Sequence, residues 1–200
     1  MEMQPFRQVI TSGEALLKDR ASKFYAYAFA CPDLAAFEAQ MAECKKQHPT
    51  ARHFCWAGRW GQPLEERAND AGEPAHSAGA PILHALQSAE VLQSSAIVVR
   101  YFGGTKLGVP GLIAAYRAAT EEALAVAHIT EVFPMIHVTC TLPYERIGSV
   151  ELLLRQVHAQ IIDSTYGTQC HLTFSLKQLD WAELQARLKA FTDIDVVQSI

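Results

Sequence analysis

The chain has 200 residues, half of them hydrophobic, and a formal net charge of −4. Such a length and composition support one large or two small globular domains, and they exclude a disordered tail. An acidic chain is also unsuited to wrapping nucleic acid by bulk attraction, although local basic patches can still bind it. No apolar stretch reaches the roughly 18 residues of a membrane span, and the start lacks a basic leader, so we expect a cytoplasmic protein without a membrane partner.

The five cysteines are odd in number and scattered, and no two of them form a C-x-x-C motif. This pattern predicts reduced, mostly buried thiols rather than a disulfide framework or a zinc site. They are Cys31, Cys44, Cys55, Cys140 and Cys170.

Strand and helix patterns follow one another through the first 60 residues. Strands are expected at 8–10, 15–17, 23–30 and 52–60, where apolar and aromatic residues alternate with polar ones. A helix should fill the space between the last two, because Pro32-Asp33 is a typical helix opening and His48-Pro49 a typical end.

The next segment is punctuated by glycine and proline. Its expected elements are a polar loop at 61–74, a helix capped by Ser77 that carries Ile82, Leu83 and Leu86, a strand at 95–102 and an alanine-rich helix at 112–126. The strand is the clearest of these because it is nearly continuous in β-branched and apolar residues.

After about Thr130 the pattern starts again. It predicts a strand at 136–142, a helix at 144–157, strands at 160–166 and 169–176, a helix at 180–191 and a strand at 194–200. This β-α-β-β-α-β order is that of a ferredoxin-like unit. We therefore predict an α+β protein with an N-terminal β-α-β domain at 1–130 and a ferredoxin-like domain at 131–200, joined near 128–134.

The stretch YFGGTKLGVPGL, residues 101–112, is the densest in glycine. It is not a Walker loop, since Val109 and Pro110 occupy the places of Lys and Ser or Thr, and no dinucleotide fingerprint can be read. Two interpretations remain: the turn binds an anion through backbone N–H groups, or its glycines serve backbone geometry. We expect geometry to dominate at Gly103, Gly104 and Gly108, with anion binding as a secondary use, because Pro110 lacks an N–H.

The stretch NDAGEPAHSAGAP, residues 69–81, carries two carboxylates beside a histidine and a serine. General acid–base catalysis, a Ser-His pair and a metal site are all conceivable, but a hard cation normally requires more oxygen ligands. We favour a turn in which Asp70 and Glu73 cap local N–H groups. In ARHFCWA, residues 51–57, His53 and Cys55 share a strand face, where core packing is a commoner role than ligation or catalysis. No metal or cofactor is predicted.

Taken in this order, the three segments resemble the IMPACT ("imprinted and ancient") family, whose bacterial branch is often called the YigZ family. The matching residues are Ser22-Lys23-Phe24, Ala51-Arg52-His53, Cys55, Ala57, Asp70, Gly72-Glu73-Pro74, Ser77-Ala78-Gly79, Pro81, Val98 to Gly104, Lys106-Leu107-Gly108, Gly111-Leu112 and Ala115-Tyr116. The resemblance covers essentially the whole chain. It implies an N-terminal domain of the ribosomal-protein and elongation factor G domain IV type, and a C-terminal domain similar to elongation factor G domain V.

For bacterial members the resemblance implies RNA or ribosome binding linked to regulation of translation. Eukaryotic relatives restrain a starvation-responsive kinase pathway and carry an additional RWD domain, which we do not expect here, so that partner is not carried over. Some positions depart from the family pattern, and they weaken an anion or metal site in this member. The main departures are Ala71, His76, Ala80, Val109 and Pro110.

Two functions follow as hypotheses. The first is a noncatalytic binder of RNA or a ribosomal surface; the alternative is a phosphate- or nucleotide-binding protein, an enzyme included, that uses the turn at 103–111. The expected nucleic-acid or anion ligands are Arg52, Arg100, Gly103, Gly104, Lys106, Gly108, Gly111 and Arg117. Motif residues without an assigned role are His53, Asp70, Gly72, Glu73, Pro74, Ser77, Gly79 and Tyr101. No catalytic residue is identified, and a monomer is the simplest expectation.

Overall fold

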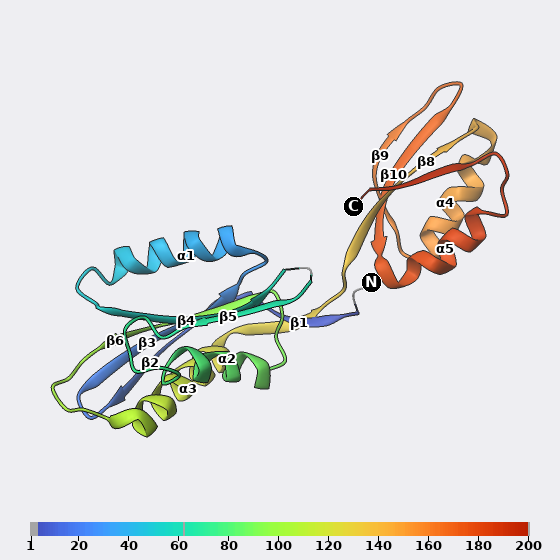
Figure 1. The fold of residues 1–200 in the computed structure, drawn as a ribbon. Helices are drawn as coiled ribbons and strands as arrows, with labels where there is room; N and C mark the ends of the chain where they lie inside the picture. The colour runs from blue at the N-terminus through green and yellow to red at the C-terminus, as the bar shows by residue number, and fades with distance from the viewer. Residues whose placement is uncertain (1–3, 62, 200) are drawn as a thin grey trace. The chain divides into compact units, whose positions relative to one another are not determined.

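The computed structural model describes residues 4–61 and 63–199, so Met1–Met3 and Ile200, the end of the last expected strand, lie outside it. Contacts divide the chain into two units. One is Phe6–Val132, and the other contains the residues from Phe133 onward together with Gln4 and Pro5. Both units combine helices with antiparallel strands (Figure 1), which confirms the α+β two-domain prediction.

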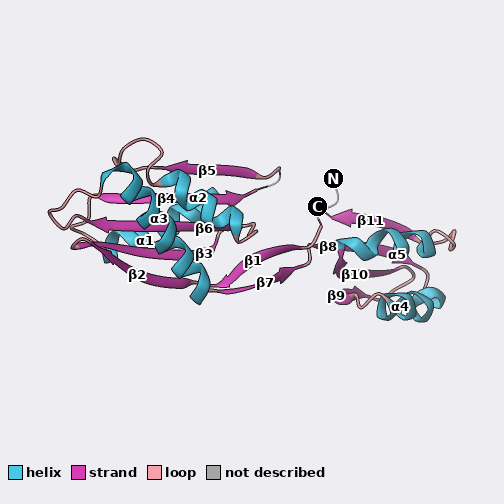
Figure 2. Ribbon diagram, turned by 90° about the horizontal axis from the view of Figure 1, so that it is seen from below, coloured by secondary structure: helices cyan, strands magenta, loops and turns pink. Residues whose placement is uncertain are grey.

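The N-terminal domain is built on a five-stranded antiparallel sheet that lies between helices (Figures 1 and 2). In sheet order its strands are β2 (Gly13–Asp19), β3 (Ser22–Ala30), β6 (Ser94–Tyr101), β4 (His53–Trp60) and β5 (Glu65–Asn69). Helix α1 (Leu34–Gln47) covers one face, and α2 (Gly79–Ser88) and α3 (Gly108–Val126) cover the other. Helix α1 begins after Asp33, whose carboxylate accepts the Ala36 N–H at 2.8 Å, as the sequence predicts.

Strand alternation gives this sheet a core on each face. Along β6, Ala96 and Val98 belong to the core beneath α2 and α3, whereas Ile97 and Val99 belong to the core beneath α1. All four are fully buried because helices cover both faces. This burial explains why the β6 pattern is nearly continuous in apolar residues.

Two strands lie where the sequence predicts loop or linker. Strand β5 lies within the expected loop 61–74, and all its residues are exposed, so it shows none of the alternation that identifies a half-buried strand. Strand β7 (His128–Val132) occupies the expected linker and pairs with β1 (Phe6–Thr11) in a separate two-stranded sheet. Its partner lies over a hundred residues earlier in the chain, so no local pattern reveals the pairing.

The C-terminal domain has the predicted β-α-β-β-α-β order. Its elements are β8 (Met135–Leu142), α4 (Ile147–Gln156), β9 (Gln160–Thr165), β10 (Cys170–Lys177), α5 (Trp181–Leu188) and β11 (Asp195–Ser199), with short 3₁₀ turns before each helix. The sheet order β11-β8-β10-β9 is antiparallel throughout, which is the ferredoxin-like arrangement. Buried residues of both helices and of the central strands form one core.

Helix lengths and hydropathy bear on membrane insertion. Among the described residues, no helix has both the length and the apolar character needed to span a bilayer.

Candidate anion-binding site

The register of the N-terminal sheet places three side chains in a row across neighbouring strands. Arg100 on β6 pairs with Phe24 on β3 and with His53 on β4. Residues two apart on a strand share a face, so Arg100 follows Val98, and His53 precedes Cys55, on the face covered by α2 and α3. The row lies at the strand ends where the β6–α3 connection begins.

One carboxylate closes the loop that leads into α2. Asp70 Oδ1 accepts the N–H groups of Ala78 and Gly79 at 2.9 and 2.8 Å, and its Oδ2 accepts the N–H of His76 at 2.8 Å. Burial opposes ionisation, but these three hydrogen bonds outweigh it and lower the pKa of Asp70 below its ordinary value. Asp70 is therefore an ionised cap whose geometry fixes the loop carrying Glu73.

The predicted cap of α2, Ser77, does not act as one. The α2 N-cap position is Ala78, which makes no side-chain capping bond, and the buried Ser77 hydroxyl donates to the carbonyl of Pro74 at 2.7 Å. Asp70 satisfies the free N–H groups from outside the helix instead. Because that carboxylate lies several residues before the helix start, sequence spacing rules for caps overlook it.

Glu73 is a buried carboxylate held by two donors. Nη1 of Arg100 and the hydroxyl of Tyr116 donate to the same Glu73 oxygen at 2.7 and 2.8 Å. The side chains of Arg100 and Glu73 are only 7% and 5% exposed. The Cys55 thiol donates to the Tyr116 hydroxyl at 3.2 Å, so a chain of hydrogen bonds runs from the core to this ion pair.

Arg100 retains hydrogen-bonding capacity beyond this ion pair. Its Nε is buried and has no hydrogen-bond partner among the described residues. The guanidinium carbon lies 5.5 Å from the ring centre of Phe24 and 5.4 Å from that of Phe102, within cation–π range of both. The two rings and Glu73 therefore orient the guanidinium while leaving one of its donors unpaired.

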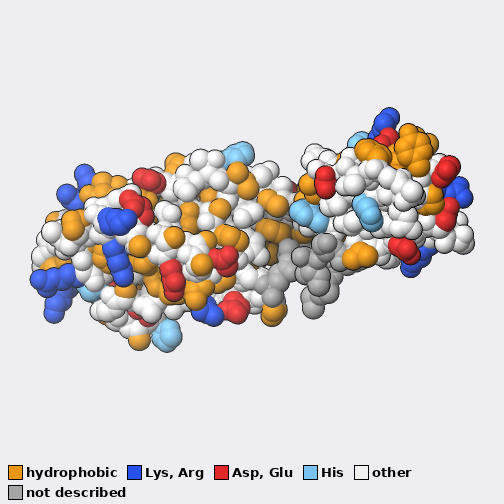
Figure 3. Space-filling model, turned by 90° about the horizontal axis from the view of Figure 1, so that it is seen from above, with side chains coloured by type: hydrophobic (Ala, Val, Ile, Leu, Met, Phe, Trp, Pro, Cys, Tyr) orange, Lys and Arg blue, Asp and Glu red, His pale blue; other side chains and the backbone are white. Residues whose placement is uncertain are grey.

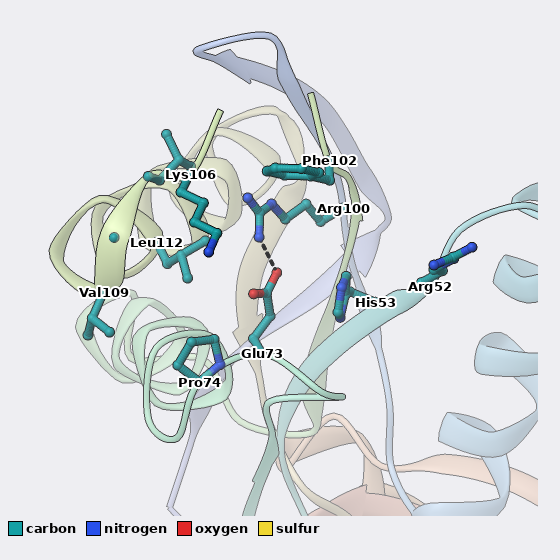
Figure 4. A pocket seen from close by; sticks show the side chains of 11 residues that line it. Arg52, His53, Glu73, Pro74, Arg100, Phe102, Lys106, Val109 and Leu112 are labelled. Carbon is teal, nitrogen blue, oxygen red and sulfur yellow. Dashed lines mark hydrogen bonds and ion pairs between the residues drawn. The ribbon is translucent and has the colours of Figure 1, made fainter. Parts of the chain in front are cut away.

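A cavity of about 500 Å³ opens beside this guanidinium. Figure 4 shows Arg100 between Phe102 and Glu73, with Lys106 facing it and Arg52 further away beyond His53. The lining residues are Arg52, His53, Glu73, Pro74, Arg100, Phe102, Lys106, Leu107, Gly108, Val109 and Leu112. Three cations and one carboxylate line the cavity, so its formal charge is +2 with His53 neutral, in a protein whose net charge is −4.

The N-terminus of α3 forms part of the cavity wall. Its N-cap residue Leu107 provides no side-chain cap, and the first turn holds no acidic residue. The free N–H groups and the helix dipole therefore add positive potential on this side, although Pro110 contributes no N–H.

Two different constraints act on the glycines of the β6–α3 connection. A Cβ on Gly103 would lie 2.1 Å from the carbonyl carbon of Ala21, so the backbones approach too closely for any side chain. Gly104 and Gly108 have φ of +91° and +73° with no close neighbours at a Cβ position, so their constraint is conformational. Gly111, in the first turn of α3, lies against the N-cap residue Leu107.

Several predicted site residues have partners elsewhere. Arg117 does not line the cavity and pairs with Glu121 at 2.7 Å on the exposed face of α3. Tyr101 points to the α1 face, where its hydroxyl lies 3.0 Å from Nδ1 of His48. Gly72 lies beside His53, and Gly79 against the backbone of Asn69.

The catalytic arrangements considered from sequence do not assemble. Nδ1 of His53 lies 3.0 Å from the carbonyl oxygen of Ala71, so this nitrogen carries the donated hydrogen, while the Cys55 thiol also contacts the carbonyl of Asp70 at 3.0 Å. Burial raises the pKa of Cys55 to about 12, which leaves it a neutral thiol near pH 7. Within the described ranges no three His, Cys, Asp or Glu side chains gather as a metal site.

Cationic side chains also gather outside the cavity, at one end of the domain. Figure 3 shows Lys and Arg side chains concentrated at the left end of the larger domain, where Figure 1 places the β2–β3 turn and the β6–α3 connection. Lys18 and Lys23 pair across strands beside that turn, and Lys23 lines a second cavity of about 300 Å³ together with Phe102. Phe102, 55% exposed, borders both cavities.

Two residues of the site were not singled out by sequence reasoning. Phe102 ends an apolar run and reads as core, yet it is exposed at the cavity. Tyr116 lies four residues after Leu112 on the buried stripe of α3, so helical periodicity predicts its burial but not its hydroxyl's partner. The only sequence signal for either residue is its place in the motif segments.

Comparisons with known proteins agree with the fold. Residues 20–124 match the model of the Impact N-terminal domain, and residues 140–193 match a domain of unknown function, DUF1949. The chain is 34% identical over 160 residues to the IMPACT family member YigZ of Escherichia coli, covering 78% of each chain. It is 33% identical over 164 residues to an IMPACT family member of Haemophilus influenzae, covering 80% of this chain and 79% of that one. A crystal structure of a hypothetical protein superposes with a TM-score of 0.71 at 28% identity, covering 98% of this chain and 97% of the other.

Proposed function

This chain belongs to the IMPACT family, and on that premise we propose that it is a noncatalytic RNA-binding protein with a role in the regulation of translation. The cavity bordered by Arg52, Arg100 and Lys106 is its RNA contact.

The main support for the proposal is a positively charged cavity in an acidic protein, with an exposed aromatic ring at its edge. The cavity lining has a formal charge of +2 within a chain of −4, and Phe102 is 55% exposed at its edge. Proteins that bind single-stranded RNA combine cations that contact phosphates with aromatic rings on which bases stack. Such stacking contributes about 1–3 kcal/mol per base.

The described residues that line the cavity include no activated nucleophile, which supports a binding function rather than catalysis. In the described part of the cavity wall, the polar groups are cations, one histidine bonded to a carbonyl and a carboxylate engaged by two donors. A nucleophile–base pair of the kind used in covalent catalysis is not assembled there. The link to translation rests on what the family resemblance implies: an N-terminal domain of the ribosomal-protein and elongation factor G domain IV type and a C-terminal domain similar to elongation factor G domain V.

Salt-dependent binding to short single-stranded RNA tests the proposal. Each phosphate contact contributes about −0.7 to the slope of log K against log salt for single strands. We expect Arg52→Ala and Lys106→Ala each to reduce that slope by about 0.7, because both side chains are exposed at the cavity. Lys45→Ala is the matched control, since Lys45 is exposed on α1 and lines neither cavity. Binding that is absent, or equally salt-sensitive in all variants, refutes the proposal.

A phosphorylated small molecule is the second candidate, favoured by the size of the cavity. A volume of about 500 Å³ falls within the range of about 300–1,000 Å³ typical of small-ligand sites. A ligand at about 100 times its dissociation constant stabilises the protein by about 2.7 kcal/mol, which a thermal-shift screen detects. Stabilisation by nucleotides or sugar phosphates without any RNA binding would favour this candidate over the first.

A further inference from the structure

The buried Arg100 side chain supplies information about the ligand that exposed cations do not. Its side chain is only 7% exposed, its Nη1 donates to Glu73, and its Nε has no hydrogen-bond partner among the described residues. Buried polar groups without partners are rare in folded proteins, and leaving one costs about 1–3 kcal/mol. The guanidinium lines the cavity and, among the described residues, has Glu73 as its carboxylate partner, which suits it to a further anionic acceptor.

We propose that this cavity receives a phosphate monoester, the terminal phosphate of an RNA strand, whose oxygens accept from the Arg100 guanidinium. This inference rests on the proposed RNA-binding function and specifies which part of the RNA enters the site. The end of an RNA strand and a free nucleotide both carry a phosphate monoester, so the site recognises the same chemical group in either source.

Depth is the first argument for a terminal group. An internal phosphate of a single strand is linked to a nucleoside on both sides, so it reaches a nearly buried group less easily than a phosphate at a strand end. The Arg100 side chain is 7% exposed and lies between Phe102 and Glu73 (Figure 4). A phosphate that reaches it must project from the chain, as one does at a strand end.

Charge is the second argument. A phosphate monoester carries about −1.5 to −2 at pH 7, whereas an internal diester carries one negative charge. The lining cations Arg52, Arg100 and Lys106 exceed the single carboxylate Glu73 by two charges. The cavity therefore neutralises a monoester and leaves an excess with a diester. The uncapped first turn of α3 adds further positive potential.

Phe102 offers a stacking surface for the nucleoside that carries the terminal phosphate. The ring borders the cavity, has one flank occupied by the Arg100 guanidinium at 5.4 Å and remains 55% exposed. A terminal base can stack on this exposed part while its phosphate faces Arg100. Beyond the ring, the second cavity with Lys23 and Tyr25 offers room for the next nucleotide.

The experiment compares four uridine tetranucleotides, with a 5′-phosphate, a 3′-phosphate, both or neither, and includes uridine monophosphate and inorganic phosphate as small probes. Affinity is measured at fixed salt, and the Arg100 Nε–H resonance is followed by ¹⁵N NMR. We expect one terminal phosphate to improve affinity at least tenfold and to shift the Arg100 resonance. Lys106→Ala should reduce this preference, and Lys45→Ala should preserve it.

The outcomes separate the two proposals. If all four oligonucleotides bind equally and the Arg100 resonance stays in place, the terminal-phosphate inference is wrong while RNA binding stands. If uridine monophosphate shifts that resonance and no oligonucleotide binds, the monoester site is supported with a free nucleotide as its source, and the RNA function fails. Arg100→Lys tests whether the guanidinium group itself is needed, because lysine keeps the positive charge but has no guanidinium. An unchanged preference for the terminal phosphate in this variant also overturns the inference.

Discussion

Replacing Gly103 by alanine tests whether the glycine-rich connection is shaped by packing or by a ligand. The new Cβ would lie 2.1 and 2.2 Å from the carbonyl carbon and oxygen of Ala21 and 2.4 Å from the Ser22 nitrogen. All three are backbone atoms, so no side-chain rotation relieves the overlap. The backbone at Ala21 and Ser22 would have to move by about 1.5 Å to restore normal van der Waals separation.

The expected destabilisation has two parts. Overpacking of this kind costs about 1–3 kcal/mol. The shift also disturbs the hydrogen bond from the Gly103 N–H to the buried Ser22 hydroxyl, 3.2 Å long, which contributes about 1 kcal/mol. We therefore expect Gly103→Ala to cost about 3 kcal/mol. Gly104→Ala, where the Cβ meets nothing within 4 Å, should cost only the roughly 1–2 kcal/mol of a positive φ.

Urea unfolding followed by tryptophan fluorescence measures the difference. Trp56 and Trp60 lie in the N-terminal domain and Trp181 in the other, so a Trp181→Phe background isolates the relevant transition. With a slope of about 2 kcal/mol per molar urea, a loss of 3 kcal/mol lowers the midpoint by about 1.5 M. If Gly103→Ala is no less stable than Gly104→Ala while ligand binding is lost, the packing explanation is refuted.

Three further predictions concern the buried network and the loop before α2. Tyr116→Phe removes one donor from Glu73 and should cost about 1–2 kcal/mol in urea unfolding, against no loss for Tyr144→Phe, whose parent side chain is exposed. The folded pKa of Asp70 lies below its unfolded value of about 3.9, so its stabilisation is present above that pH and is lost as pH falls through the folded pKa; Asp70→Asn should show a shallower loss of stability between pH 5 and 2, and parallel curves would contradict this. Cys55, with its pKa raised to about 12 by burial, should resist a thiol reagent at pH 8 until urea unfolds the domain, and rapid labelling of the native protein would disprove its burial.

Elements with a strong local signal could be predicted from the sequence. Helix α1 has its Asp33 cap, β6 its continuous apolar run and the C-terminal domain its complete β-α-β-β-α-β order. Strands β5 and β7 could not be predicted, because one is wholly exposed and the other is held by pairing with the distant β1. Local periodicity reports burial on one face, and β5 buries none of its residues.

The site was predictable as a set of segments but not as a set of contacts. Three cations expected to bind an anion, Arg52, Arg100 and Lys106, do line one cavity, whereas Arg117 pairs with Glu121 away from it. The ion pair between Arg100 and Glu73 joins residues 27 positions apart, through a loop whose shape Asp70 sets. Sequence spacing cannot supply such a contact, because it depends on sheet register and loop closure together.

On the proposed function, the buried ion pair serves ligand recognition rather than stability. Removing two charges from water costs several kcal/mol per ion, and well-packed apolar side chains of similar volume often serve a core equally well or better. Here the arrangement is also incomplete, since Glu73 engages only one edge of the Arg100 guanidinium and Nε remains unpaired. If this region served packing alone, we would expect the Arg100 Nε–H to have a hydrogen-bond partner, or an apolar residue to replace the arginine. Glu73, Tyr116 and Phe24 instead hold the guanidinium in one orientation before any ligand arrives, which reduces the entropy lost on binding. On the proposed function, a bound anion would use a guanidinium that is already oriented, and this orientation is what the ion pair contributes.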